Sequence, residues 1–182
     1  MQNALLVIDI QDSFKAGERW TQRNNPAFEE NVTTLIEGFR RAKQPVIYFL
    51  DDDGDEHFNP RSPLFRLMDF LKPREGEPII HKYSRNCFTT TNLQQHLVSN
   101  GVSKVTICGI KTEQCCETTA RIASDLGFQV DFVTEATLTF PISGGAGGRT
   151  LSADDVVERT EFALRDRFAA IKTVEDVLSR LG

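Results

Sequence analysis

The 182-residue sequence has no apolar run long enough to cross a membrane. Its longest apolar runs, such as residues 4–8, are short, whereas a spanning helix needs about 20 predominantly apolar residues. No positively charged residue precedes residues 4–8, as a secretory leader would require. We therefore expect a soluble protein that neither enters a membrane nor is exported.

Basic residues are in the minority, because 21 Lys and Arg stand against 26 Asp and Glu, which gives a formal net charge of -5. The cations are scattered along the chain and form no stripe that would neutralise a phosphate backbone. The composition therefore argues against a nucleic-acid partner. A small molecule is the expected ligand.

The four cysteines lack the C-x-x-C spacing of a structural zinc site. Cys108, Cys115 and Cys116 lie too close together in sequence to suggest a disulfide framework in a domain of this size. Free thiols are typical of a reducing compartment, so we expect a cytoplasmic protein without structural zinc.

Short runs rich in Val, Ile and Phe alternate with amphipathic stretches, a pattern typical of strands joined by crossover helices. Most of these runs are apolar throughout, which indicates strands that are buried on both faces of a largely parallel sheet. The sequence therefore predicts one domain over residues 1–182, an α/β fold in the form of a three-layer α/β/α sandwich with a doubly wound, mainly parallel six-stranded sheet. The predicted strands cover residues 4–10, 45–50, 78–81, 104–110, 128–134 and 170–172.

Helix-start signals agree with this arrangement. Asn25 followed by Pro26 predicts the start of a helix between the first two strands. Ser152 with Asp155 predicts a capping box at the start of a later helix. Long loops in compact domains often carry function. Three irregular segments of this kind cover residues 12–25, 51–77 and 135–150.

Ligands of an open doubly wound sheet bind beyond the carboxyl ends of its strands, and three residues there could carry chemistry. Asp9 ends an apolar run, so its carboxylate either has a buried partner or caps a turn. Lys82 follows the third strand and is either solvated or the cation that holds this carboxylate. Cys115 falls in the first turn of the next helix, where backbone N–H groups favour a thiolate and an oxyanion. The alternative for Cys115, which we assign to Cys108 and Cys116, is a buried thiol that packs the helix on the sheet.

Other residues are weaker candidates. The glycine-rich segment 143–149 lacks the Lys-Ser or Lys-Thr ending of a P-loop and is interpreted as a pocket loop. The three histidines have no metal-ligand spacing and are assigned structural positions: His57, His81 and His96. Aromatic residues near the predicted strand ends either contact substrate in a pocket wall or anchor the core and loops: Phe14, Trp20, Phe49, Tyr83 and Phe88.

Three motifs together resemble the isochorismatase-like cysteine hydrolases. They are LLVIDIQDSF at residues 5–14, Lys82 ahead of Phe88, and GIKTEQCCETTA at residues 109–120. The motifs occur in the family's order, each at the strand end where the family carries it. They span most of the chain, and the third motif is the most distinctive.

The resemblance implies a catalytic triad of Asp9, Lys82 and Cys115. In such a triad Cys115 attacks a carbonyl carbon, Asp9 accepts and returns the proton, and Lys82 orients the pair, so that the reaction passes through a thioester. A non-proline cis peptide is expected at Ile110–Lys111, and the backbone N–H groups of Lys111 and Cys115 are expected to form the oxyanion hole. Many relatives are homo-oligomers, which implies an assembly of two or four chains.

Departures from relatives narrow the reaction. Nicotinamidases of the family bind a metal through an Asp-Trp-His-Pro segment, whereas residues 50–60 here read LDDDGDEHFNP. We therefore expect neither a metal ion nor a cofactor, and interpret the acids of residues 51–56 as an exposed loop, with a bound hard cation as the alternative. True isochorismatases lack a cysteine at the nucleophile position, so Cys115 favours an amidohydrolase for a small amide, carbamoyl or imide-derived compound. Hydrolysis of another bond and a catalytically silent ligand-binding domain are the alternatives.

Overall fold

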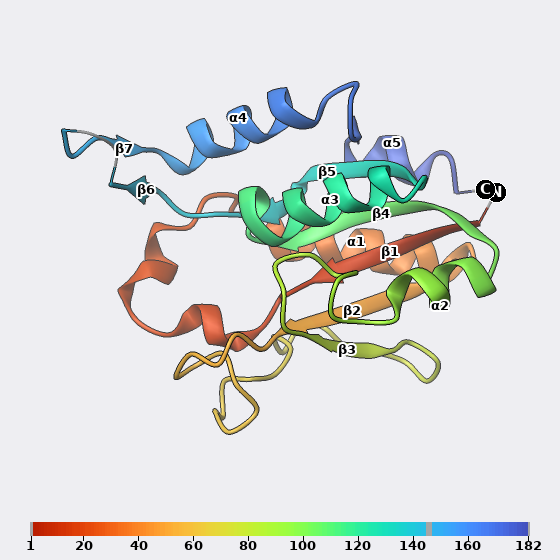
Figure 1. The fold of residues 1–182 in the computed structure, drawn as a ribbon, viewed down its shortest axis with the longest axis horizontal. Coiled ribbons are helices and arrows are strands. Elements are labelled where there is room, and N and C mark those ends of the chain that lie inside the picture. Colours follow the sequence, from red (N-terminus) through yellow and green to blue (C-terminus); the bar gives the residue numbers. More distant parts are fainter. Residues whose placement is uncertain (1, 145–146, 182) are drawn as a thin grey trace.

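The computed structural model describes residues 2–144 and 147–181, and a six-stranded sheet forms its centre (Figure 1). The strand order is β3-β2-β1-β4-β5-β8, and every pairing between neighbours is parallel. The predicted six-stranded parallel sheet is therefore confirmed. The strands are β1 (Gln2–Ile8), β2 (Val46–Asp51), β3 (Ile79–Lys82), β4 (Val102–Ile110), β5 (Gln129–Leu138) and β8 (Ala170–Ile171).

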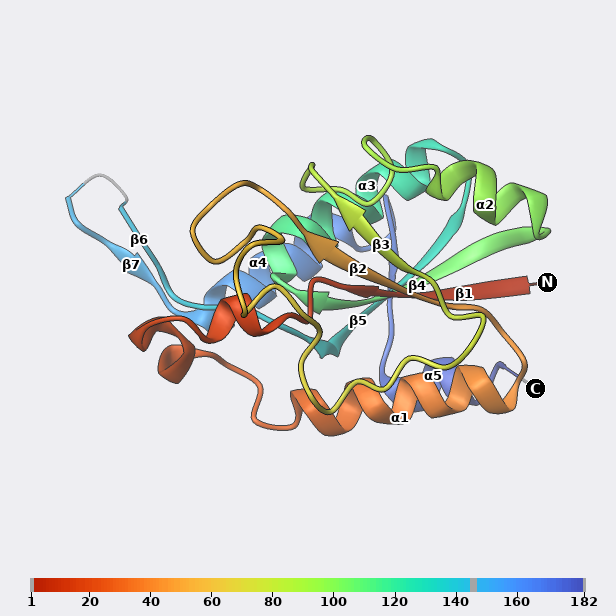
Figure 2. The same cartoon turned by 90° about the horizontal axis from the view of Figure 1, so that it is seen from below.

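Helices cover both faces of the sheet (Figure 2). α1 (Phe28–Arg41) and α5 (Val174–Leu178) pack on one face, whereas α2 (Leu93–Ser99) and α3 (Glu117–Asp125) pack on the other. α4 (Ala153–Leu164) lies on the α3 side and joins that core through its last residue. Within the described ranges, none of these helices has the length and apolar character needed to span a bilayer.

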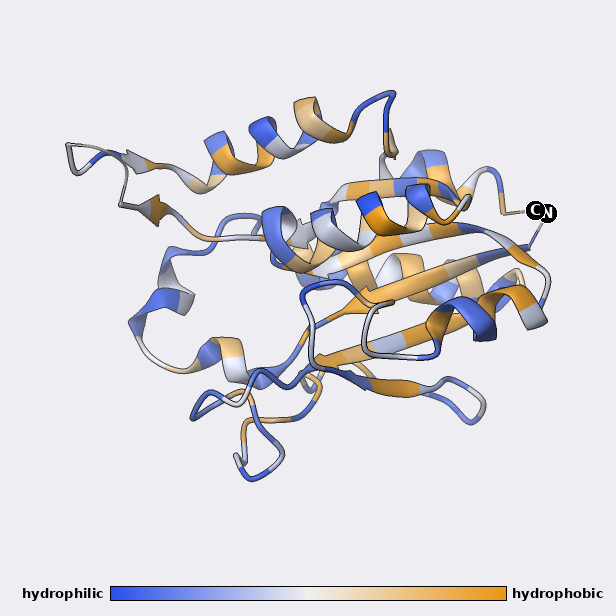
Figure 3. Cartoon of the chain, in the orientation of Figure 1, coloured by the Kyte–Doolittle hydropathy of each residue, from blue (hydrophilic) through white to orange (hydrophobic). Residues whose placement is uncertain are grey.

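The side chains of β1 show how the central strand serves two cores. Leu5 and Val7 point into the core beneath α1 and α5, whereas Ala4, Leu6 and Ile8 point into the core beneath α2 and α3. All five side chains are fully buried. Hydrophobic residues accordingly follow the strands, and polar residues dominate the loops beyond them (Figure 3). The continuous apolar run is that of a strand covered on both faces, and the predicted three-layer sandwich is confirmed.

Side-chain caps and turns set the helix starts. The Ser152 hydroxyl accepts a hydrogen bond from the Asp155 N–H at 3.1 Å, and the Asp155 carboxylate accepts one from the Ser152 N–H at 3.0 Å, which confirms the predicted capping box of α4. The predicted start of α1 at Asn25 is wrong. Asn25 has a φ of 56°, and its amide donates to two backbone carbonyls of β5, so α1 begins only at Phe28.

Two strand ends differ from the prediction. β1 ends at Ile8 rather than at residue 10, and Asp9 then adopts a left-handed conformation with a φ of 52° as the chain leaves the sheet. β5 continues to Leu138, so the segment predicted to be irregular from residue 135 begins as strand.

The strand order reverses at β1. β2 and β3 lie on one side of β1, whereas β4 lies on its other side. A crevice is expected where the strand order reverses in this way.

A small hairpin projects from the body of the molecule (Figure 1). β6 (Ile142–Ser143) pairs antiparallel with β7 (Thr150–Leu151). Residues 145 and 146 of the glycine-rich segment lie outside the described residues. The described part of that segment does not line the cavity around Cys115, which corrects its interpretation as a pocket loop.

At Gly109 the backbone of β4 lies very close to the backbone of β1, so a substitution there tests how tightly the two strands pack. Its φ is +134°, and a Cβ atom there would lie 2.0 Å from the backbone oxygen of Ile8. We expect Gly109→Ala to lower the free energy of unfolding by about 3 kcal/mol or more, because both backbone strain and overlap must be relieved. Urea denaturation followed by circular dichroism measures this change.

Gly127→Ala is the matched control. Its φ is +89°, but no atom lies within 4 Å of the added Cβ. Only the backbone strain remains there, and we expect a cost of about 1 kcal/mol. Equal losses of stability in the two variants would contradict the close approach of β4 to β1.

Candidate active site

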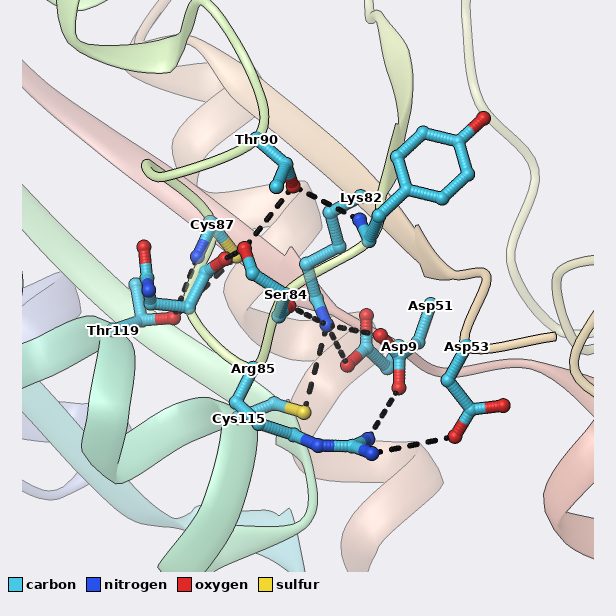
Figure 4. A network of polar contacts seen from close by, with 12 residues as sticks. Asp9, Asp51, Asp53, Lys82, Ser84, Arg85, Cys87, Thr90, Cys115 and Thr119 are labelled. Carbon is cyan, nitrogen blue, oxygen red and sulfur yellow. Dashed lines mark hydrogen bonds and ion pairs between the residues drawn. The ribbon is translucent and has the colours of Figure 1, made fainter. Parts of the chain in front are cut away.

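Four polar side chains meet where the central strands end (Figure 4). Asp9 follows β1, Asp51 is the last residue of β2, and Lys82 is the last residue of β3. Cys115 lies on a π-helical turn, η3 (Thr112–Cys116), that joins β4 to α3. Asp51 and Lys82 are register partners across β2 and β3. The structure thus brings together the three predicted triad residues and adds Asp51 to them.

Lys82 Nζ is the centre of this cluster. It lies 2.9 Å from Asp9 Oδ2 and 2.8 Å from Asp51 Oδ1. It also donates to the Ser84 backbone oxygen at 3.0 Å and to Cys115 Sγ at 3.5 Å. Burial alone would lower the pKa of Lys82, but the carboxylates of Asp9 and Asp51 help to raise the pKa above its ordinary value. The fully buried ammonium group therefore stays charged.

Asp9 is the candidate proton acceptor of the cluster. Burial raises the pKa of the Asp9 carboxyl to about 7, against the attraction of Lys82, and the charge of Asp51 raises it further. Asp9 Oδ1 is buried and accepts no hydrogen bond from the residues that the structure describes. The ligand atoms of Asp9 and Cys115 lie within 4.8 Å of each other. An ionised Asp9 is therefore placed to accept the thiol proton.

Cys115 is a neutral thiol at rest. Burial, followed by the carboxylate of Asp9, raises its pKa well above the ordinary value, and the opposing effect of Lys82 is smaller. This result differs from the expectation that the helix N-terminus stabilises a resting thiolate, because burial outweighs that field. The other three cysteines are fully buried, in agreement with the structural roles predicted for Cys108 and Cys116.

A cavity of about 280 Å³ opens beside Cys115. Part of its wall is aromatic: the ring centroids of Phe14 and Phe58 are 4.9 Å apart at an angle of 81°, and those of Phe14 and Phe140 are 6.3 Å apart. A cavity of this size fits a small molecule. The polar and charged residues of the lining are Ser13, Arg19, Asp51, Asp53, Asp55, His57, Arg85, Lys111 and Gln114.

The five aromatic residues that the sequence offered as substrate contacts do not share this cavity. Phe14 lines it, and its contact with substrate stays a prediction. Phe49 is fully buried in the core two residues before Asp51, and Phe88 stacks on Phe128 in the same core at a centroid distance of 6.0 Å. The prediction for Phe49 and Phe88 is therefore wrong, because both side chains lie below the strand ends rather than beyond them. The other aromatic candidates also lie outside the lining: Trp20 and Tyr83.

Lys111 lies between β4 and η3. The Ile110–Lys111 peptide bond is cis, as the resemblance implied. The Lys111 side chain is half-buried and lines the cavity together with Cys115. The assignment of the Lys111 and Cys115 backbone N–H groups to an oxyanion hole stays a prediction.

Side-chain cations surround the carboxylates, although the ligand atoms of Asp9, Asp51 and Cys115 lie within 4.8 Å of one another, as a metal site would require. Lys82 Nζ bridges Asp9 and Asp51, and a metal ion between these carboxylates would have to displace it. Arg85 in turn lies 3.0 Å from Asp51 Oδ2 and 3.4 Å from Asp53 Oδ2. The expectation that the site needs no metal ion stays a prediction.

Sequence reasoning missed three residues of the site. Asp51 was assigned to an exposed acidic loop, but it is 3% exposed and ends β2. A signal was available, since Asp51 ends an apolar run as Asp9 does. Arg85 and His57 both line the cavity, and the purely structural position assigned to His57 is corrected. Neither residue lies in a pattern that marks it as part of a site.

Comparisons with known proteins identify the family of this chain. Residues 3–148 match the model of the isochorismatase domain. The chain is 30% identical over 180 residues to YrdC, an uncharacterised isochorismatase family protein of Bacillus subtilis, with 98% of this chain and 95% of the relative covered. It is 31% identical over 159 residues to Nicotinamidase 3 of Arabidopsis thaliana, with 75% of this chain and 73% of the relative covered.

A solved structure shows the same fold along the whole chain. An isochorismatase-family protein from Chromobacterium violaceum superposes with a TM-score of 0.91 at 28% sequence identity, and the match covers 100% of this chain and 94% of that one. The chain belongs to the isochorismatase family.

The rate of Cys115 labelling by iodoacetamide tests its coupling to Asp9. We expect the rate to fall as the pH is lowered through about 7, because a protonated Asp9 cannot accept the thiol proton. Above that pH the carboxylate is ionised and the rate levels off, since the pKa of the thiol itself lies well above its ordinary value. Mass spectrometry of the peptide that contains Cys115 measures the rate at each pH.

Asp9→Asn is the informative control for this profile. The amide cannot accept the proton, so we expect slower labelling and no step near pH 7. A step of unchanged position in Asp9→Asn would show that another group controls the thiol. Cys115→Ala identifies labelling at the other cysteines.

Proposed function

We propose that this member of the isochorismatase family is a hydrolase that cleaves the C–N bond of a small amide or carbamoyl compound, with Cys115 as nucleophile. The observation that carries the proposal is the placement of the Cys115 thiol beside Lys82 and within 4.8 Å of Asp9, at the wall of a small cavity. A nucleophile, a proton acceptor and a fixed cation at one cavity wall are the groups that acyl transfer requires.

The first half of the reaction acylates Cys115. Asp9 accepts the thiol proton as Sγ forms a bond to the carbonyl carbon of the substrate. The oxygen of the tetrahedral intermediate takes the negative charge, for which the Lys111 and Cys115 N–H groups are the proposed donors. When the C–N bond breaks, Asp9 returns the proton to the departing nitrogen. Ammonia or an amine leaves, and a thioester remains.

The second half of the reaction hydrolyses the thioester. Asp9, again ionised, accepts a proton from a water molecule that attacks the thioester carbonyl. Asp9 then protonates Sγ as the C–S bond breaks, and a carboxylic acid is released. A carboxyl with a pKa of about 7 suits both steps, because it accepts and returns protons at neutral pH with little loss of driving force.

Lys82 acts by position and charge rather than by proton transfer. Its raised pKa keeps it cationic through the cycle. Asp51 and the Ser84 backbone oxygen fix its ammonium group, which then holds Asp9 and the sulfur of Cys115 in contact distance. The charge also stabilises the sulfur as it loses its proton.

The relatives support an amide as substrate, since one of them is a nicotinamidase. A family member that hydrolyses another bond, or that only binds a small ligand, is the alternative. We further propose that the chain forms a homo-oligomer of two or four copies and acts in a reducing cytoplasm. All four of its cysteines are free thiols, which supports the second part of that proposal.

Ammonia release from a panel of primary amides, ureides and carbamoyl compounds tests the function. We expect Cys115→Ala to abolish release and Asp9→Asn to lower kcat by about 10²–10⁴-fold, the usual contribution of general acid–base catalysis. Cys108→Ala is the matched cysteine control, because Cys108 lies in the opposite core, and it should keep the activity. Silence of the wild type across the panel, or release that survives in Cys115→Ala, would contradict the proposal.

Chelation tests the expectation that no metal is needed. Lys82 and Arg85 already compensate the carboxylates of the site. We therefore expect ammonia release to be unchanged after dialysis against EDTA. Loss of release that zinc, iron or manganese restores would show that a metal takes part.

A further inference from the structure

The acidic residues of the cavity already have partners. Asp51 and Asp53 lie 3.0 Å and 3.4 Å from the two terminal nitrogens of Arg85. Asp53 also accepts a hydrogen bond from the Asp55 N–H at 3.0 Å, and Asp55 accepts one from the His57 N–H at 3.1 Å. These bonds join Arg85 and the three carboxylates in one network on one side of the lining, in which Arg85 pairs with Asp51 and Asp53 while the Asp55 carboxylate accepts a backbone N–H.

Two cations of the lining stand outside this network. Within the described part of the chain, neither Arg19 nor Lys111 forms an ion pair, although both line the cavity with Cys115. Arg19, on η2 (Glu18–Gln22), holds its guanidinium carbon 5.1 Å from the ring centroid of Phe140. The Lys111 side chain is half-buried in the same wall.

The environment of Lys111 is short of negative charge. Burial lowers its pKa, and the charge of Arg19 lowers it further. Glu113 acts in the opposite direction but does not reverse the shift, and its carboxylate accepts a hydrogen bond from Thr139 at 2.5 Å. An anion that enters the cavity beside Lys111 would therefore be stabilised by two cations that have little competing compensation.

We propose that the substrate carries a carboxylate, which Lys111 and Arg19 bind while its amide or carbamoyl carbonyl lies against Cys115 Sγ. This inference rests on the proposed function and names its substrate class. Lys111 and Cys115 line the same cavity of about 280 Å³, so one small molecule would present its carboxylate to the first and its scissile carbonyl to the second. Monoamides of short dicarboxylic acids and N-carbamoyl amino acids have this chemistry.

Two alkylating reagents that differ in one charge test the binding step without turnover. Iodoacetate carries a carboxylate and iodoacetamide is its neutral counterpart. We expect the ratio of Cys115 labelling rates, iodoacetate over iodoacetamide, to be higher in the protein than in glutathione. In Lys111→Met the ratio should fall about fivefold to tenfold, the effect of one charge at close range in a partly screened site. Lys111→Arg keeps the positive charge and should retain most of the wild-type labelling ratio.

Further variants separate a local charge effect from a general one. Arg19 lies on an exposed turn, where water screens its charge more than that of Lys111. Arg19→Gln should therefore lower the labelling ratio by a smaller factor than Lys111→Met. Lys72→Met removes an exposed lysine that does not line the cavity, and the ratio should equal that of the wild type. A ratio in Lys111→Met equal to that of the wild type would overturn the proposal.

Turnover then tests the substrate class. Wild type should release ammonia from succinamate with a kcat/KM at least about tenfold above that for neutral succinamide, and Lys111→Met should lose this preference mainly through KM. Equal preference in wild type and Lys111→Met would overturn the inference. If no amide is hydrolysed but the labelling ratio depends on Lys111, the hydrolase function fails while the anion site stands.

Discussion

One buried ammonium group, that of Lys82, holds the site together. Two carboxylates and a thiol come from the ends of three other strands, and none of them could be buried beside the others without a cation among them. Lys82 Nζ contacts Asp9, Asp51 and Cys115 at distances of 2.8–3.5 Å. The parallel sheet makes this possible, because it brings the carboxyl ends of its strands to one edge.

The same cluster divides the chemical roles by their pKa values. Lys82 stays charged, and Cys115 stays protonated until it attacks. Asp9, with a pKa near 7, is the group that changes protonation state at neutral pH. Burial and spacing thus support the roles that we propose for them, with Lys82 as fixed charge, Cys115 as nucleophile and Asp9 as proton carrier. The cavity wall adds a second division, with acidic residues around Arg85 on one side and the cations Arg19 and Lys111 outside that network.

The sequence predicted the sheet well, because apolar runs buried on both faces have few alternatives. Asp9 and Cys115 were also predictable, since Asp9 directly follows an apolar run, Cys115 lies in the turn after the next apolar strand, and both lie within motifs that resemble the family. The cavity wall was not predictable, because it depends on long-range contacts of the irregular loops. Gln11 is an example: its backbone bridges to Leu67, and its amide oxygen accepts a hydrogen bond from the Asp51 N–H at 2.7 Å. Nothing in the local sequence predicts such pairings.

The central claim is that Cys115 carries the acyl group during turnover. Mass spectrometry of protein quenched in acid while it hydrolyses its best amide substrate tests that claim most directly. The account predicts the mass of the acyl group on the peptide that contains Cys115, an adduct that disappears when the substrate is exhausted. Ammonia release at an undiminished rate by Cys115→Ala, with this peptide never modified in the wild type, would contradict it.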